Sequence, residues 1–350
     1  MRYIELRDRC DDFEGVADLW RRVWGSYYGG RSWIVMPDAT FFRWQLAPES
    51  GAMCHVAYDK AKLVGCVFSL PFLLRMDGST HRTALVFGLT VDPEHRGLAL
   101  PLVARLRRCN AERGISFALG LMTNDPASPS HVFWTKYGNA FPRNLRVLLP
   151  LDCWVKALAP QVVAHASIKH WERVAMRGLG PLFALTPCQH DPDVRPYRAA
   201  DLQQCAEIVE QAAAAFDWAM VWSPQELSHR LDTPSGGTLV LDRGGGIRAV
   251  VNYHCIVMQG RARVLAAVIA LWADDGLSAV ERIKLLGYLC SHLREVGVHM
   301  VTAVRCAMLP SSAFWANLFM PTPGPWQLAA VINGAAPALA VPKRGGFPIM

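Results

Sequence analysis

The sequence predicts a mixed α/β fold in which central strands are flanked by helices on both faces. An antiparallel strand meander over 54–91 precedes a strand–helix–strand crossover over 84–122, and the same succession recurs in the second half of the chain. A meander beside a crossover gives a mixed sheet, and helices must cover its faces. This order of elements excludes a doubly wound parallel fold.

The first fifty residues predict one strand and two helices. Residues 3–7 alternate in the manner of a strand. Asp11 or Asp12 can cap a helix over 13–24, where apolar residues recur at helical spacing. The aromatic segment 39–45 predicts a short second helix, and we expect most of its aromatic side chains in the core.

The stretch 84–114 is the centre of the prediction. Its apolar run is typical of a buried strand ending at Val91, and an amphipathic helix follows that Gly114 can end. The turn between them contains Arg96 and Gly97. A turn into a helix gathers backbone N–H groups at the positive end of the helix dipole. The stretch therefore predicts a phosphate or pyrophosphate site.

After this helix the pattern predicts the end of the first unit and a connector. A core strand covers 115–122, a polar loop and a short helix over 131–137 follow, and a last strand covers 145–151. An apolar and basic helical stretch over 158–177, followed by Gly and Pro residues, predicts a connector packed against both halves.

The second half resembles the first, which indicates an internal duplication. The segment Phe314–Trp315 follows a glycine, a strand and a Pro/Ser loop, in the same order as Phe133–Trp134. Chance similarity of two α/β units is the alternative. At the place of Arg96–Gly97 the second half has two carboxylates, which would repel a pyrophosphate. We expect three parts: residues 1–151, a connector over 152–192, and a degenerate copy over 193–350.

Charge and cysteine content exclude several classes of protein. The 36 basic and 29 acidic residues give a net charge of +7 without a Lys/Arg block, which suits an anionic ligand and argues against nucleic-acid binding. The 10 cysteines form no CxxC pair, so we expect reduced thiols and no metal site. No apolar run reaches the ~18 residues of a membrane span. The charged start MRYIELRDRCDDF lacks the apolar segment of a secretion signal, so we expect a cytoplasmic protein.

Three segments resemble the GNAT N-acetyltransferase superfamily. The run Val91-Asp92-Pro93-Glu94-His95-Arg96-Gly97-Leu98-Ala99 is similar to motif A of that superfamily, V-x-P-x-x-R-G-x-G-x-G/A, in the required strand–turn–helix context. The segments FFRWQ (41–45) and Asn124…FWTKYG (133–138) also resemble it. The resemblance covers residues 2–151.

The resemblance implies two tandem GNAT-like domains, of which the first binds acetyl-CoA or another acyl-CoA as a substrate. It implies that the cofactor-binding residues are Leu89, Thr90, Val91, Arg96, Gly97, Leu98 and Ala99. An amine of a small molecule or sugar would attack the thioester directly. The alternative for Arg96 is an ordinary surface arginine in a turn.

Several residues depart from the family pattern. Ala99 stands where a glycine is expected, and Pro101 removes one N–H from the phosphate cradle. Trp134 occupies the position where the family often has a tyrosine that protonates the leaving thiolate. The candidates for catalysis are then Asn124, which a turn-capping role explains equally well, and Tyr137, whose alternative is an ordinary half-buried tyrosine. No acidic residue on the strand 84–91 offers a general base.

Two other functions remain open. The basic helix face of Arg105, Arg107 and Arg108 could meet an acyl carrier protein that donates the acyl group. A non-catalytic GNAT-like binding or assembly protein would explain Ala99, Pro101 and the missing carboxylate. The pattern predicts neither the acceptor nor the oligomeric state.

Overall fold

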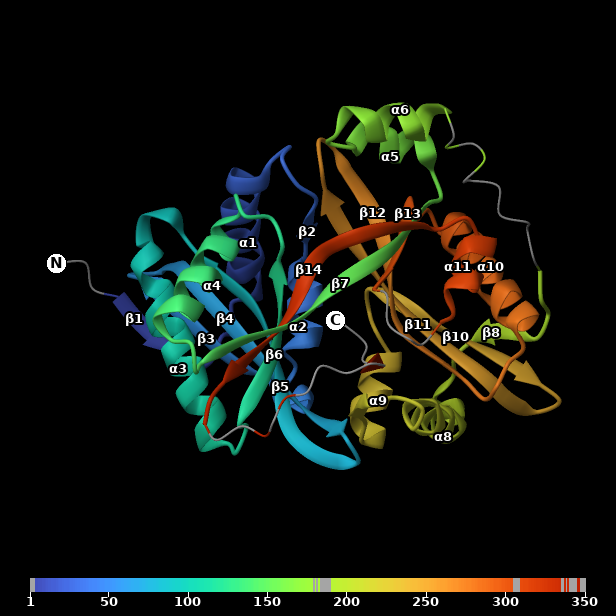
Figure 1. The fold of residues 1–350 in the computed structure, drawn as a ribbon, viewed down its shortest axis with the longest axis horizontal. Helices are drawn as coiled ribbons and strands as arrows, with labels where there is room; N and C mark the ends of the chain where they lie inside the picture. Colours follow the sequence, from blue (N-terminus) through green and yellow to red (C-terminus); the bar gives the residue numbers. More distant parts are fainter. Residues whose placement is uncertain are drawn as a thin grey trace.

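The protein folds around one continuous mixed sheet with helices on both faces (Figure 1). The computed structural model describes residues 4–178, 190–304 and 309–334, together with 180, 182, 337, 339, 345 and 346. Neighbouring residues of one strand pack on opposite faces: Met53 and Ala57 belong to the core beneath one helix, and Cys54 and Val56 to the core beneath others. The mixed α/β prediction is confirmed.

The first half contains seven strands and four α-helices in the described residues. They are β1 (Ile4–Arg7), α1 (Phe13–Tyr28), β2 (Ile34–Met36), α2 (Ala39–Gln45), β3 (Met53–Asp59), β4 (Lys62–Met76), β5 (Ser79–Val91), α3 (Ala99–Glu112), β6 (Phe117–Thr123), α4 (Pro129–Ala140) and β7 (Leu145–Ala157). Short 3-10 helices, η1 (Pro48–Ser50) and η2 (Pro93–Leu98), follow α2 and β5. The caps form where the sequence has Asp: Asp12 accepts from Gly15 N–H at 2.8 Å, and Asp38 from Phe41 N–H at 2.8 Å.

The second half repeats this succession after two connecting helices. Its elements are α5 (Pro160–Ala166), α6 (His170–Gly178), β8 (Val194–Pro196), η3 (Ala199–Asp201), α8 (Leu202–Ala213), β9 (Trp218–Val221), α9 (Pro224–Leu231), β10 (Gly236–Arg243), β11 (Gly246–Gln259), β12 (Arg263–Asp274), α10 (Ala279–Glu295), β13 (Met300–Val304), α11 (Ser311–Ala316), β14 (Met320–Ile332) and β15 (Gly345–Gly346). The duplication inferred from the sequence is visible in this repetition.

The order of strands across the sheet is a palindrome of the two halves. It runs β1-β3-β4-β5-β6-β14-β7-β13-β12-β11-β10-β8, so each strand of the first half has a counterpart at the same distance from the other end. The parallel pair β5–β6 corresponds to the parallel pair β12–β13. In these pairs Ala84–Val86 occupies the position of Ala266–Val268. This register aligns the central strands of the two halves.

The two halves exchange their last strands. β14, from the end of the chain, pairs with β6 of the first half, and β7 pairs with β13 of the second half. The two exchanged strands also pair with each other, so they form the middle of the sheet (Figure 1). The division into residues 1–151, 152–192 and 193–350 therefore remains a proposal about the duplicated units, whose sheet is shared.

Three expected boundaries differ from the structure. The first helix runs on to Tyr28, four residues past the expected end. The helical stretch expected over 158–177 consists of two helices, because Ser167 adopts an extended conformation and separates α5 from α6, with its hydroxyl bonded to the Val163 carbonyl. The strand expected over 145–151 continues to Ala157, where it pairs with β13.

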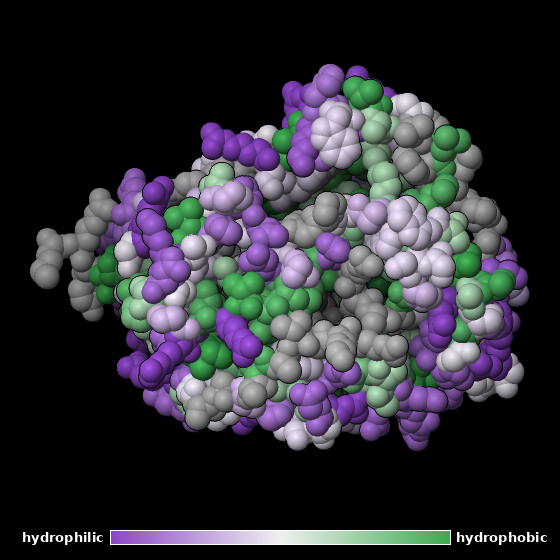
Figure 2. All heavy atoms as spheres, viewed as in Figure 1, coloured by the Kyte–Doolittle hydropathy of each residue, from purple (hydrophilic) through white to green (hydrophobic). Residues whose placement is uncertain are grey.

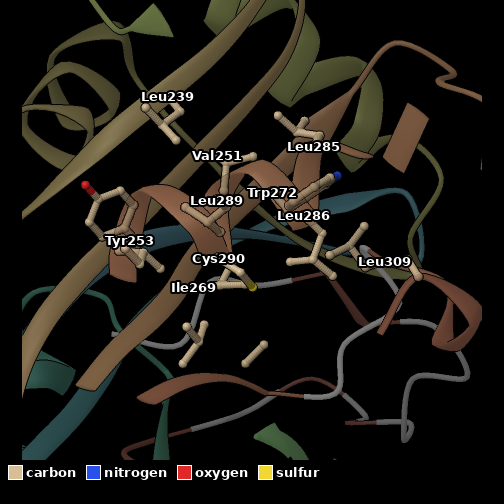
Figure 3. Close-up of a cluster of buried hydrophobic side chains, with 14 of the residues drawn as sticks. Leu239, Val251, Tyr253, Ile269, Trp272, Leu285, Leu286, Leu289, Cys290 and Leu309 are labelled. Carbon is tan, nitrogen blue, oxygen red and sulfur yellow. The ribbon is translucent and has the colours of Figure 1, made fainter. Parts of the chain in front are cut away.

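Each half has its own apolar core. In the second half the core lies between α10 and the strands β10–β12, and Figure 3 shows its side chains converging: Leu239, Val251, Tyr253, Ile269, Trp272, Leu285, Leu286, Leu289, Cys290 and Leu309. On the face of Figure 2, apolar side chains also gather where β6, β14 and β7 run side by side. Within the described residues, no helix is long and apolar enough to cross a membrane.

Candidate functional site

The parallel strands β5 and β6 diverge toward the end that precedes α3. They pair only over Ala84–Val86 and Ala118–Gly120. Beyond Val86, β5 remains bonded to β4 while β6 bonds to β14. The expected cofactor-binding residues Leu89, Thr90 and Val91 all lie on the diverging part of β5. Such a divergence leaves backbone groups of β5 without a partner strand on one side, where an extended ligand can bind.

A bulge at Gly88 turns the backbone of β5 at the start of this divergence. Cys66 pairs with Thr90 and Phe68 with Phe87, so Gly88 and Leu89 share one opposing residue of β4. Gly88 has φ +73°, and a Cβ there would lie 2.5 Å from the Phe68 ring. Only glycine fits this position. Gly88 was not among the predicted site residues, although a glycine inside an apolar strand is a recognised signal for a bulge.

The helix start next to this bulge has no cap of its own. Leu98 precedes α3 without a side-chain capping hydrogen bond, and the first turn contains no acidic residue. Gly97 is exposed, and a Cβ built on it would meet no atom within 4 Å, so the protein's own packing does not require glycine there. Arg96 is exposed at the same turn. The 3-10 helix η2 runs directly into α3, and the Ala99 N–H donates to the Arg96 carbonyl. A helix N-terminus without a side-chain cap and with a nearby arginine is suited to a phosphate group.

The buried carboxylate of Asp92 fixes the turn between β5 and α3. Its carboxylate is 7% exposed, accepts from Glu94 N–H at 3.2 Å and lies 3.3 Å from Arg22 and 3.4 Å from Lys62. Burial alone would raise the pKa of Asp92, but the Glu94 N–H and these two cations outweigh it and lower the pKa. The carboxylate thus stays charged and fixes the turn.

The equivalent turn of the second half is closed by its own side chains. The sheet register places Asp274 where the first half has Asp92. Asp274 accepts from Gly276 N–H at 3.2 Å, from Leu277 N–H at 3.0 Å and from Arg282 at 2.7 Å. Ser278 and Glu281 then form a capping box at the start of α10. At the start of α3 backbone bonds replace these side-chain caps: the His95 N–H donates to the Asp92 carbonyl at 2.8 Å, and the Ala99 N–H donates to the Arg96 carbonyl.

The structure brings Leu89 and Tyr137 into one cluster. Leu89 packs against residues from α3, β6, α4 and β14, which are Val103, Met122, Trp134, Tyr137, Ala329 and Val331. Trp134 and Tyr137 share one face of α4, with ring centroids 5.7 Å apart. Tyr137 is buried. The candidate catalytic tyrosine therefore lies beside the diverging strands rather than on a remote surface.

The other candidates are placed less centrally. Asn124 directly follows β6, at the loop that leads to the Ser128 cap of α4. Thr90 is buried and its hydroxyl accepts from the Trp24 indole N–H at 2.9 Å, so its side chain faces α1. Leu98 packs against the core beneath α3, and Ala99 begins that helix. Thr90 can reach a ligand through its backbone, and Ala99 through its methyl group.

The arginines proposed to meet a carrier protein are mostly engaged within the chain. Arg105 makes a two-pronged ion pair with Asp8, and Arg107 donates to the Ile332 carbonyl at 2.8 Å. Arg108 is exposed, 3.8 Å from Glu112. A group that could hold a metal, Asp8, His55 and Cys109, lies at the same helix, but the guanidinium already neutralises its carboxylate.

Comparison with known proteins agrees with this geometry. Residues 7–121 match the model described as an acetyltransferase (GNAT) domain. No curated protein matches the sequence.

Three solved structures illustrate the fold. N-myristoyltransferase of Saccharomyces cerevisiae with bound myristoyl-CoA is 13% identical, with a TM-score of 0.75 over 96% of this chain and 84% of that one. A probable N-acyltransferase from Enterococcus faecalis V583 and a GCN5-related N-acetyltransferase from Anabaena variabilis are each 12% identical, with TM-scores of 0.54 over 95% of this chain and 73% of theirs. At these identities the likeness establishes the fold, and the family match applies to residues 7–121. The chain therefore shares the fold of these acyltransferases over nearly its whole length, and its residues 7–121 are similar to a GNAT acetyltransferase domain.

Proposed function

We propose that the protein transfers an acyl group from acyl-CoA to an amine of a small molecule or sugar, and that its first half holds the donor. One observation carries the proposal: the helix start beside the diverging strands has no side-chain cap in the first half and a capping box in the second. The Arg96 side chain and the N–H groups of Arg96–Leu98 would bind the pyrophosphate, Ala99 would contact it through its methyl group, and the pantetheine arm would extend along β5.

The chemistry follows from the bulge. The Leu89 N–H would donate to the thioester carbonyl oxygen and stabilise the negative charge that develops there. The amine nitrogen attacks the carbonyl carbon and loses a proton to water, and the C–S bond breaks. The departing thiolate takes up a proton, for which Tyr137, in the same cluster as Leu89, is the candidate donor. Asn124 would orient the acceptor or the pantetheine.

The donor site is tested by titrating acetyl-CoA, octanoyl-CoA and myristoyl-CoA into the protein by calorimetry. Arg96→Ala should weaken binding roughly 10- to 100-fold, because a charge-assisted hydrogen bond contributes ~1.5–3 kcal/mol. Arg108→Ala, an exposed arginine of the same helix region, is the control and should bind as the wild type does. Binding of none of these donors would refute the proposal and favour a non-catalytic binding protein.

The two catalytic candidates are tested by turnover. Tyr137→Phe should lower kcat by about 10²-fold or more if the hydroxyl acts as the proton donor. Unchanged kcat in that variant would mean that Tyr137 contributes only to the packing of the apolar cluster. Asn124→Ala should raise KM for the acceptor or the donor, and a variant with both constants unaltered would leave Asn124 as a turn residue.

A further inference from the structure

A buried arginine lies where the two halves meet, away from the open helix start. Arg230 of α9 is 7% exposed. Its guanidinium lies 5.0 Å from the centroid of the Trp44 ring of α2 and 5.7 Å from that of Trp222. Its one side-chain hydrogen bond in the described part of the chain goes to the Gln45 Oε1, at 3.4 Å. No described carboxylate lies within ion-pair distance of it.

Two further polar groups beside Arg230 are incompletely bonded. His254 is 3% exposed; its Nδ1 lies 3.0 Å from the Thr233 hydroxyl, and its Nε2 has no partner among the described residues. Asn252, two residues earlier on the same face of β11, uses its Nδ2 toward the Thr238 hydroxyl and neighbouring carbonyls, while its Oδ1 has no partner there. When the Thr233 hydroxyl donates to Nδ1, the His254 Nε2 carries the proton and is a donor.

This arrangement is electrostatically incomplete. Burial of a cation without an anion costs several kcal/mol, and buried polar groups in proteins are normally bonded. Burial lowers the pKa of Arg230 to about 10, and burial together with Arg230 lowers the pKa of His254 to about 3. His254 is therefore neutral at physiological pH, and the cluster has one positive charge. One planar guanidinium with one neutral donor matches a single planar anion.

We propose that Arg230 and His254 bind the carboxylate of a small molecule, and that the Asn252 Oδ1 accepts a hydrogen bond from a hydroxyl or amino group next to that carboxylate. Trp44 and Trp222 form the apolar sides of this site, because the guanidinium lies over both rings. Trp44 also belongs to the aromatic core that includes Phe68 and reaches Phe87, the residue before the Gly88 bulge. The core thus joins the carboxylate site to the proposed donor site.

The carboxylate can come from two sources. It can belong to the acyl acceptor, a reading that rests on the proposed transferase function, or to a separate effector, a reading that does not. Direct binding measurements therefore come first, because they hold whether or not the protein transfers an acyl group.

The binding experiment uses glycolate, glycine, acetate and the neutral analogue ethylene glycol, at constant ionic strength. Glycolate and glycine should raise the unfolding temperature of the wild type more than acetate does, and ethylene glycol should not raise it. Arg230→Met should lose at least tenfold in glycolate affinity, whereas the exposed control Arg108→Met should keep it. Equal responses of Arg230→Met and the wild type, or no response of the wild type, would overturn the proposal and make Arg230 a purely structural cation.

A second measurement does not depend on a folded Arg230 variant. In wild-type protein with labelled histidine, the His254 ring signals should shift on titration with glycolate and stay unchanged with ethylene glycol. Unshifted His254 signals at saturating glycolate would refute the site.

Turnover assays then separate the two sources, using glycine against methylamine and lysine against cadaverine as acceptors. If the acceptor supplies the carboxylate, the KM for glycine and lysine should be lower than for the matched amines, and Arg230→Lys should remove that difference. If an effector supplies it, glycolate should change kcat without being consumed. Absence of any transfer would refute the proposed function and leave the binding result standing.

Discussion

The starts of α3 and α10 occupy equivalent places in the two halves, yet only the start of α10 has a side-chain cap. Both follow an aspartate at the end of the central strand, Asp92 or Asp274. In the first half this aspartate supports the turn from behind and leaves the helix start uncapped. In the second half Asp274 accepts from the Gly276 and Leu277 N–H groups, and Ser278 caps α10 in a capping box with Glu281. The difference is that one helix start of the duplicated fold has a side-chain cap and the other has none.

The β-bulges that precede these two turns also differ between the halves, in backbone conformation and in the packing around them. Each half has one extra residue in its central strand, around Gly88 in β5 and at Ala270 in β12. Gly88 has a left-handed conformation, whereas Ala270 has not. Two residues further, the small Thr90 corresponds to the buried Trp272, which belongs to the core of the second half. In the second half this region therefore belongs to the apolar core.

Separating the halves should have the largest effect. A fragment of residues 1–192 lacks β14, so β6 and β7 lose the strand between them, and a fragment of 193–350 lacks β7. Neither fragment should show a cooperative thermal transition alone. Mixing them should restore it in part. Independent, cooperative folding of residues 1–192 would contradict the idea that the exchanged strands make the halves one folding unit.

Substitutions at the two bulge residues, Gly88 and Ala270, should have the second-largest effect. Gly88→Ala places a Cβ 2.5 Å from Phe68 at a positive φ, so acyl-CoA affinity should fall at least tenfold and stability by ~1–3 kcal/mol. Ala270→Gly should cost about 1 kcal/mol and leave acyl-CoA affinity unchanged. Calorimetric titration and denaturant unfolding of both variants provide the measurement. Equal loss of affinity in the two variants would mean that the halves contribute alike.

Removing the charge of Asp274 should destabilise the fold moderately. Asp274→Asn loses the ion pair with Arg282 and should cost ~1.5–3 kcal/mol at pH 7. Burial alone would raise the pKa of Asp274, but its hydrogen bonds with Arg282 and Trp272 outweigh that and lower it. The contribution is therefore present above the unfolded pKa of about 4 and disappears as pH falls through the lower folded pKa. Urea unfolding from pH 7 to pH 3 tests this: a stability difference that widened toward low pH would have the wrong sign.

The smallest effect concerns the cap alone. Ser278→Ala should cost about 1 kcal/mol, because it removes half of the capping box, without altering acyl-CoA affinity. Its counterpart Leu98→Asp gives α3 a side-chain cap in the place where α10 has Ser278, and the added negative charge should weaken acyl-CoA binding by about tenfold. Thermal unfolding measures the first and calorimetry the second. Tighter acyl-CoA binding in Leu98→Asp would contradict an anion site at α3.

The elements with local signals could be predicted from the sequence. The Asp38 cap and the aromatic run after it define α2, and the apolar strand before Arg96–Gly97 places the candidate site at the start of α3. These features depend on neighbours within a few residues, which the sequence displays directly. The duplication was also visible, because each repeated element keeps its own periodicity.

Features made by distant contacts could not be predicted. β14 contains Pro321, Pro323 and Pro325, which are typical of loops, and its register with β7 shifts across this stretch. The proposed carboxylate site combines Arg230 and His254 with Trp44. Arg230 is 185 positions after Gln45, the neighbour of Trp44, so no local pattern connects these residues. The strand exchange likewise leaves no trace in the order of elements.

The exchange of strands also sets a time at which the proposed donor site can be completed. The β14 residues Ala329 and Val331 belong to the same apolar cluster as Tyr137. Asn333, directly after β14, donates a hydrogen bond from its side chain to the Ile115 carbonyl, 218 positions earlier in the chain. During synthesis at about 5–20 residues per second, the first half would therefore wait tens of seconds or less for its missing strand. Until then its central edge is unpaired, and a nascent chain could bind acyl-CoA at α3 only beside an unfinished sheet.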